Sequence, residues 1–405
     1  MKQEFYGPHF SLFTADKIQG GVVVPTLKSN IESASTTDTQ KLAATTFVKA
    51  ILSKGMTKSF FGYTYFQELF AEYMDVADAG DIRTMAPSVV DHSIHLLSTR
   101  AGTKVVAACA SYGTPKDRKR ICKSLKGYMK SSLMHKDAYM AILRLCQVTD
   151  DTVSIHKSLL NELLTAPTPK STSIDDEKEG EADSLLLELA LDENASKLFL
   201  MLLVEDDEAR VKYFDPCYER AILEAQPMVK ENGESVPTSK KDPNARRLEL
   251  LQYMNQALIE LCTKHTAELL QSLPGSRVLK EVYATFAPQE VVDATIQVCL
   301  ASLEDEKDEV FEDPICHRSV KNMILCDEKK DKPLFAQAFV EQLSDRLMDI
   351  SASNRGAFVV AALLKVPGVK PKALAKLKSG VKKLKELSKQ KGATAGYDAL
   401  LKEMS

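Results

Sequence analysis

The side chains best placed to do chemistry in this 405-residue chain are basic residues between positions 115 and 136, where eight Lys and Arg residues accompany a single acid, Asp117. At about 100° per residue of a helix, six of the bases fall on one face and apolar residues on the other. Arg118 falls on the apolar side, which predicts a structural role. Clustered cations bind phosphates, so the pattern predicts a nucleic-acid-binding strip, with a solvated lysine-rich surface as the alternative. The strip consists of Lys116, Lys119, Arg120, Lys123, Lys126 and Lys130.

A second basic stretch runs from 368 to 391, with nine lysines and one acid, Glu386. Leucines at helical spacing form its apolar stripe, which favours a terminal capping helix with a basic outer face. A membrane-surface helix or a calmodulin-type target is the alternative, weakened by the absence of Trp. Whether this face touches nucleic acid stays open. Its candidate residues are Lys372, Lys376, Lys382 and Lys383.

Signals for catalysis or metal binding are weak. The chain has no GxGxxG, P-loop, HExxH or GxSxG motif, and none of its eight cysteines forms a CxxC pair. His92 and His95 are three residues apart, but no third ligand motif completes a metal site. We therefore expect no enzyme, no cofactor, no metal and no small-molecule substrate. Without a signal peptide or an apolar run of about 20 residues, we also expect a soluble, intracellular protein with no membrane contact.

Composition and periodicity indicate the fold class. Hydrophobic residues make up 44% and charged residues 27%, with a net charge of −3, as in ordinary globular proteins. Helical periodicity recurs in short segments, which predicts an all-α solenoid with units of about 35 to 45 residues. We expect helical repeats over 1–165, a disordered acidic loop over 166–183, and further helical repeats over 184–405 with a second loop at 229–244. Both loops lack apolar periodicity, so we predict that they are mobile and dispensable.

Several phrases, in the same order along the chain, resemble the Puf-A family of nucleolar Pumilio-like proteins. Three lie between residues 111 and 152: SYGTPKDRK from Ser111, KGY from Lys126 and DDT from Asp150. KKDPNARRLELL from Lys240 is similar to the family's segment leading into its C-terminal CPL region. ASNRGA from Ala352 is similar to a signature near the family's C-terminal end, and EFYG from Glu4 to a phrase within its repeats.

The resemblance implies an array of divergent Pumilio repeats, bent or L-shaped, that binds structured RNA or DNA without a base code. It also implies a nucleolar or nuclear location, a role in large-subunit rRNA maturation with pre-ribosomal proteins as partners, and translational regulation in some members. Family members carry repeats before the Glu4 phrase, so we expect a truncated N-terminal end with exposed aromatics such as Phe5 and Phe10. A HEAT- or armadillo-like protein scaffold without a nucleic-acid role is the alternative.

Pumilio repeats read one base each through three side chains of one helix. The corresponding positions here are 103, 104 and 107, then 138, 139 and 142, then 196, 197 and 200, and finally 357, 358 and 361; we call them the reading positions. Half of these twelve positions hold Ala, Ile or Leu, which cannot bond a base edge. Lys104 and Lys197 remain candidates for phosphate contact, and Tyr139 and Phe358 for base stacking. The pattern predicts binding through backbone charge and shape, with little sequence preference.

Overall fold

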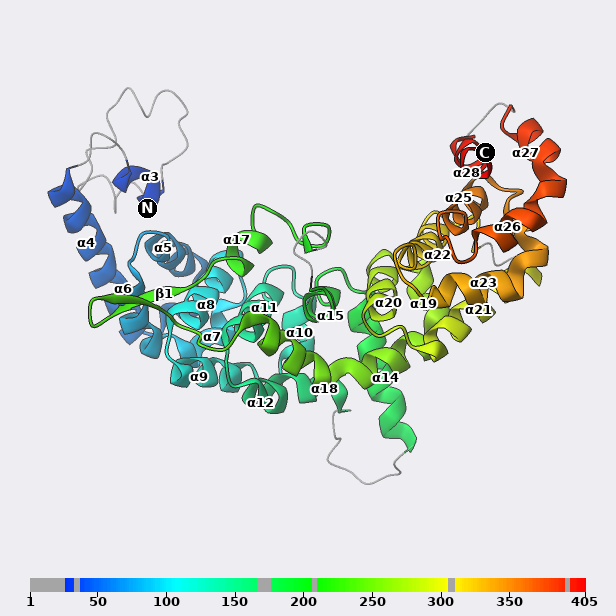
Figure 1. Ribbon diagram of the computed structural model, residues 1–405. Helices are drawn as coiled ribbons and strands as arrows, with labels where there is room; N and C mark the ends of the chain where they lie inside the picture. The colour runs from blue at the N-terminus through cyan, green and yellow to red at the C-terminus, as the bar shows by residue number, and fades with distance from the viewer. Residues whose placement is uncertain (1–25, 33–36, 166–175, 206–209, 305–309, 390–393) are drawn as a thin grey trace. The chain divides into compact units, whose positions relative to one another are not determined.

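The computed structural model describes residues 26–32, 37–165, 176–205, 210–304, 310–389 and 394–405 (Figure 1), and of 176–183 only the helical backbone. The N-terminal aromatics and residues 166–175 of the predicted acidic loop lie outside this range. The described chain is helical apart from one two-stranded sheet. The all-α helical-repeat fold expected from the periodicity is therefore confirmed.

The chain forms two compact units: unit 1 comprises residues 1–163 and 214–250, and unit 2 comprises 164–213 and 251–405. Neither unit is continuous in sequence, so the division differs from the expected domains, which follow one another along the chain.

The elements up to the acidic segment are α3 (Leu27–Ile31), α4 (Asp38–Thr57), η1 (Phe60–Gly62), α5 (Thr64–Met74), α6 (Ala79–Met85), η2 (Ala86–Ser88), η3 (Val90–His92), α7 (Ser93–Leu96), α8 (Arg100–Tyr112), α9 (Pro115–Leu125), α10 (Met129–Met134), α11 (Tyr139–Val148), α12 (Thr152–Ile155), η4 (His156–Leu160) and α13 (Asn161–Leu164).

The remaining elements include those that return to unit 1. They are α14 (Asp176–Leu191), α15 (Ser196–Leu203), α17 (Glu219–Leu223), β1 (Met228–Glu231), β2 (Glu234–Pro237), α18 (Pro243–Lys264), α19 (Thr266–Gln271), α20 (Leu273–Phe286), α21 (Gln289–Glu304), α22 (Cys316–Leu325), α23 (Leu334–Leu343), η5 (Ser344–Arg346), α24 (Leu347–Ile350), α25 (Asn354–Leu363), α26 (Lys370–Leu377), η6 (Lys378–Gly380), α27 (Val381–Leu387) and α28 (Ala395–Met404). Residues 176–183, expected in a disordered loop, therefore form the first turns of α14.

Two rows of helices build the repeats of unit 1. Helices α5, α8 and α11 pack side by side in one row, and α7, α9 and η4 form the adjoining row, with α9 also against α8 (Figure 1). Each row is held by apolar side chains that are almost fully buried, such as Val105 of α8 and Ile142 of α11. This stacking of neighbours is how a solenoid buries a continuous core.

Three helices begin in the same way, with a Ser or Thr N-cap and a glycine three residues later. In α8 the Thr99 hydroxyl accepts a hydrogen bond from the Gly102 amide, and in α25 Ser353 does so from Gly356. A Cβ at Gly102 would lie 1.9 Å from the Leu96 carbonyl oxygen of the preceding helix, and one at Gly356 would lie 1.9 Å from that of Ile350. Glycine is required here because successive helices approach each other at their backbones. Ser272 and Gly275 repeat the motif in α20.

Residues 214–242, which we call the strap, return from unit 2 to pack on unit 1. The loop expected over 229–244 is in fact a hairpin in which β1 pairs antiparallel with β2, followed by the first residues of α18. Asn232 and Gly233 form its turn with positive φ angles, as a tight hairpin requires. Strand β1 packs against α6 and α17 against α11 (Figure 1). Val229 of β1 is 3% exposed. The expected irregular loop is therefore wrong for this segment, and its packing on unit 1 argues against the predicted mobility.

Unit 2 is built from helical pairs of the same kind, with one polar contact at its centre. The Tyr283 hydroxyl of α20 donates to the fully buried carboxylate of Asp327 (2.6 Å) and accepts from the Phe335 amide of α23 (2.9 Å). The expected basic helix over 368–391 is in fact two short helices, α26 and α27, separated by η6. It is also not terminal, because α28 follows and packs against α25 and α27.

Candidate nucleic-acid interface

Helix α9 carries the centre of the predicted basic strip. Thr114 and Asp117 form a capping box that starts the helix, and Pro115 occupies its first turn. Such a cap stabilises a helix by about 1 kcal/mol. Ile121, Cys122 and Leu125 are 1% exposed or less and face the core. The opposite side of the helix is thereby fixed toward solvent.

The helix ends at Leu125, five residues before the predicted strip does. Lys126 adopts an extended conformation, Gly127 has a φ of +87°, and a new helix, α10, begins at Met129. The single helix assumed for the strip is therefore wrong, because the left-handed backbone at Gly127 interrupts it. The six bases lie on two helices and the turn between them, and Lys116, Lys119, Lys123, Lys126 and Lys130 are all exposed.

One base of the strip, Arg120, is already paired with acids. The Arg120 guanidinium donates to both carboxylate oxygens of Asp91, at 2.9 and 2.6 Å, and lies 3.6 Å from Asp117. These hydrogen bonds lower the pKa of Asp91 below its usual value. Arg120 is thus largely neutralised, which weakens it as a phosphate ligand.

Four of the five lysines of the strip lack such partners in the part of the chain that the structure describes. Among the described residues, no carboxylate lies within ion-pair distance of Lys116, Lys119, Lys123 or Lys126. Asp151 comes near enough to Lys119 for the lysine to contribute to lowering the pKa of that carboxylate, an effect due first to the Ser154 amide. The strip therefore presents exposed ammonium groups that a phosphate backbone can approach.

Arg118, on the other side of α9, is 1% exposed and joins the helix to the strap. Its guanidinium donates to the carbonyl oxygens of Ala110 (2.7 Å) and Ser111 (3.2 Å), and to the carbonyl and hydroxyl oxygens of Thr238 in the strap (3.1 and 2.9 Å). Burial lowers its pKa to about 10, which leaves it charged at neutral pH. The predicted structural role of Arg118 agrees with these contacts.

Arg144 of α11 makes a second buried connection. It donates to the Ser111 hydroxyl (2.8 Å) and to the carbonyl oxygens of Leu223 (3.1 Å) and Ala225 (2.6 Å) in the strap. Sequence reasoning did not single out Arg144 or the strap. Their contacts join residues about 80 to 120 positions apart, so no local pattern could reveal them.

The reading positions are largely closed to a ligand. Thr103, Ala107, Ala138 and Ile142 are all buried, as are Ser196, Leu200, Ala357 and Ala361. Tyr139 is 4% exposed and its hydroxyl donates to Glu219 of the strap, so the expected base stacking at Tyr139 is wrong in this structure. Phe358 is half-buried, with the Lys321 ammonium 5.9 Å from its ring centre.

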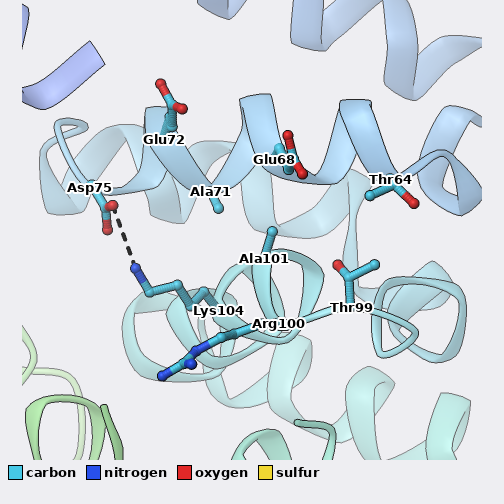
Figure 2. A pocket seen from close by; sticks show the side chains of 9 residues that line it. All are labelled: Thr64, Glu68, Ala71, Glu72, Asp75, Thr99, Arg100, Ala101 and Lys104. Atoms are coloured by element: carbon cyan, nitrogen blue, oxygen red, sulfur yellow. Dashed lines mark ion pairs between the residues drawn. The ribbon is translucent and has the colours of Figure 1, made fainter. Parts of the chain in front are cut away.

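Lys104 lies in a groove of about 380 Å³ between α5 and α8, shown in Figure 2. Its ammonium group is 3.6 Å from Asp75, and Glu68 and Glu72 line the same groove. Arg100 at the groove edge stacks over the Tyr218 ring of the strap at 3.7 Å. Because acids outnumber bases here, the groove disfavours phosphate and Lys104 is a weak phosphate ligand.

The remaining candidates lie in unit 2. Lys197 of α15 is half-buried, whereas Lys372, Lys376, Lys382 and Lys383 are exposed on α26 and α27. Lys376 is 2.6 Å from Asp345, which compensates its charge. Contact between the other lysines and nucleic acid stays a prediction.

The described residues contain no cluster of potential metal ligands and no membrane-spanning helix. No three His, Cys, Asp or Glu side chains gather there as a metal would require. His92 instead stacks on Phe61, with ring centres 4.3 Å apart. Six cysteines are buried, Cys326 is half-buried and Cys217 is exposed. None of the described helices is both long and apolar enough to span a bilayer.

Comparison with known proteins adds three findings. A model of the CPL (NUC119) domain matches residues 191–334. The chain is 26% identical to the Schizosaccharomyces pombe "Pumilio homology domain family member 6" over 89% of its length and 52% of that relative. It is 25% identical to the human "Pumilio homolog 3" over 84% of its length and 49% of that protein. The chain thus spans about half the length of the curated relatives it matches.

Solved structures agree on the fold. The crystal structure of human Puf-A in complex with DNA matches 99% of this chain and 72% of the Puf-A chain, with a TM-score of 0.76 and 22% identity. The RNA-binding domain of yeast Puf5p bound to SMX2 RNA matches 85% and 82%, with a TM-score of 0.54 and 11% identity. The fold is therefore that of Pumilio-type helical repeats, and the resemblance based on the sequence phrases is confirmed.

Proposed function

We propose that this chain, which is similar to Puf-A proteins of the Pumilio family, binds structured RNA through the basic strip of unit 1. In this proposal the lysines contact the phosphate backbone and the shape of the RNA decides which sites fit. The reading positions contribute no base code. Human Puf-A, similar in fold, has been crystallised with DNA, which supports a nucleic acid as the ligand class.

One observation carries the proposal. The basic strip is exposed and most of its lysines have no carboxylate partner, while most side chains at the reading positions are buried. A protein arranged in this way attracts any phosphate backbone, and its affinity falls steeply with salt. Little preference among base sequences follows, because hydrogen bonds to base edges supply that preference.

We further propose that the RNA is a precursor of the large ribosomal subunit, bound in the nucleolus together with pre-ribosomal proteins. The resemblance to Puf-A proteins and the CPL match support this assignment. Translational regulation is a secondary role of the same binding activity. In cells, depleting the protein should raise the level of large-subunit rRNA precursors, measured by northern blotting. Unchanged precursors would refute the ribosomal part of the proposal while leaving RNA binding intact.

The binding proposal is tested by reversing three charges of the strip, with Lys119→Glu, Lys123→Glu and Lys126→Glu combined. We expect affinity for several unrelated RNA hairpins to fall by about tenfold or more at 0.1 M salt, equally for all. The slope of log affinity against log salt is negative, and its magnitude should become smaller by about three, one for each lost phosphate contact. Fluorescence anisotropy across a salt series measures both quantities.

The matched control reverses three lysines on another part of unit 1, Lys41, Lys54 and Lys58, and alters the net charge by the same amount. This control should change affinity by less than about threefold, because exposed charges outside the interface are screened. An unchanged affinity in the strip variant would contradict the proposal. If the parent protein shifts no RNA at moderate salt, the protein-scaffold alternative is favoured instead.

A further inference from the structure

We propose that Tyr128 is a stacking site for an unpaired base, next to the phosphate contacts of the basic strip. The inference rests on the proposed function and refines it. The ligand would be a structured RNA with at least one unstacked nucleotide at this position, and not a continuous duplex. The proposal starts from an aromatic side chain that is 51% exposed on a part of unit 1 where its aliphatic neighbours are buried.

The backbone around Tyr128 is held firmly. The Glu162 carboxylate accepts hydrogen bonds from the Gly127 amide (2.7 Å) and the Met129 amide (2.9 Å), on either side of the tyrosine. The Tyr128 amide donates to the Leu125 carbonyl oxygen (3.0 Å), and its own carbonyl oxygen accepts from the Ser132 amide (2.9 Å). A ring on a fixed turn loses little conformational freedom when it binds a flat partner.

Positive charge surrounds this turn in sequence. Lys126 and Lys130 lie two residues to either side, and Lys123 is in the last turn of α9. All three are exposed. Channels for single-stranded nucleic acid combine these two features, with cations along the phosphates and aromatic rings for the bases. Base stacking is tolerant of sequence, because every base has a π face, so this site is consistent with the absence of a base code.

Tyr63 provides a contrast within unit 1. It is the more exposed tyrosine, at 65%, but its ring packs edge-on against Phe60, with centres 5.4 Å apart. Its neighbours Gly62 and Thr64 are uncharged, and Glu68 lies one turn further along α5. Exposure alone therefore does not distinguish Tyr128; exposure on a fixed turn among lysines does.

The experiment compares three RNA ligands of equal length with the whole chain: a single strand, the blunt duplex of that strand, and the same strand with abasic sites. We expect Tyr128→Ala to bind the single strand about tenfold more weakly than the parent, and the duplex within about twofold. Tyr128→Phe should retain the parent affinity because it can stack. Tyr128→Leu, which is apolar but cannot stack, should behave as the alanine variant does. The parent should bind the abasic strand as weakly as Tyr128→Ala binds the intact one.

The controls separate the possible failures. Tyr63→Ala should leave all three affinities unchanged, and a thermal melt verifies that each variant is folded. If Tyr128→Ala binds the single strand as the parent does, or weakens the duplex equally, the stacking site is refuted while phosphate binding by the strip stands. If the parent binds none of the three ligands, the proposed function fails and the stacking site fails with it.

Discussion

Helix α9 carries basic residues on two sides, one buried in unit 1 and the other exposed to solvent. Arg118 is buried and makes four hydrogen bonds that connect α8, α9 and the strap, while its neighbour Lys119 is exposed and has no ion-pair partner. A planar guanidinium can satisfy several carbonyl oxygens at once, which suits a buried junction, whereas a hydrated ammonium suits a mobile phosphate contact. The buried base of this helix thus stabilises the fold, while the exposed bases on its other side are available to a ligand.

The largest effect should come from removing the buried base. Arg118→Ala leaves the carbonyl oxygens of Ala110, Ser111 and Thr238 without their shared donor, so we expect the free energy of unfolding to fall by about 3 kcal/mol or more. Urea denaturation followed by circular dichroism measures this loss. Lys119→Ala is the matched control, because an exposed substitution costs about 0.5 kcal/mol or less. Equal losses in the two variants would remove the distinction between the two sides of α9.

A smaller loss is expected where the strap covers a reading position. Tyr139→Phe removes the hydroxyl that donates to the buried Glu219 carboxylate, which should cost about 1 to 2 kcal/mol in unfolding free energy. RNA affinity of the folded protein should stay within about twofold of the parent, in this variant and in Tyr139→Leu. Unchanged stability together with a marked loss of RNA affinity in Tyr139→Leu would restore the stacking role that the structure argues against.

The smallest effects should distinguish two bases within the strip. Lys119→Ala should weaken RNA binding by about two- to fivefold, while Arg120→Ala should change it by less than twofold, because Asp91 already compensates the guanidinium. Anisotropy titrations at 0.1 M salt resolve this difference. The single variant Asp91→Ala sharpens the comparison: it releases Arg120 from its carboxylate partner, so RNA binding should become tighter than in the parent. A larger loss in Arg120→Ala than in Lys119→Ala would show that the ion pair opens on binding.

Local sequence pattern was sufficient for the helical-repeat fold and for the basic strip. The apolar stripe and the bases of α9 follow a single helical period, so their separation onto two faces, including the inward position of Arg118, could be predicted. The apolar reading positions could be recognised in the same way, since Ala, Ile and Leu lack base-bonding groups wherever they lie. A signal for the break in the strip was also present, because Gly127 stands within the predicted helix.

Tertiary structure alone decided which of these groups stay available to a ligand. Asp91 reaches Arg120 across 29 residues, Glu219 covers Tyr139 across 80, and Thr238 meets Arg118 across 120. Each pairing depends on how segments far apart in the sequence pack together. The strap has too few apolar residues at regular helical or strand spacing to indicate where it packs. The sequence determines which charges and rings exist and on which helix face they lie. The fold then determines which of them are already occupied, because a charge held by a carboxylate or a ring held under the strap has lost the solvent exposure that binding needs.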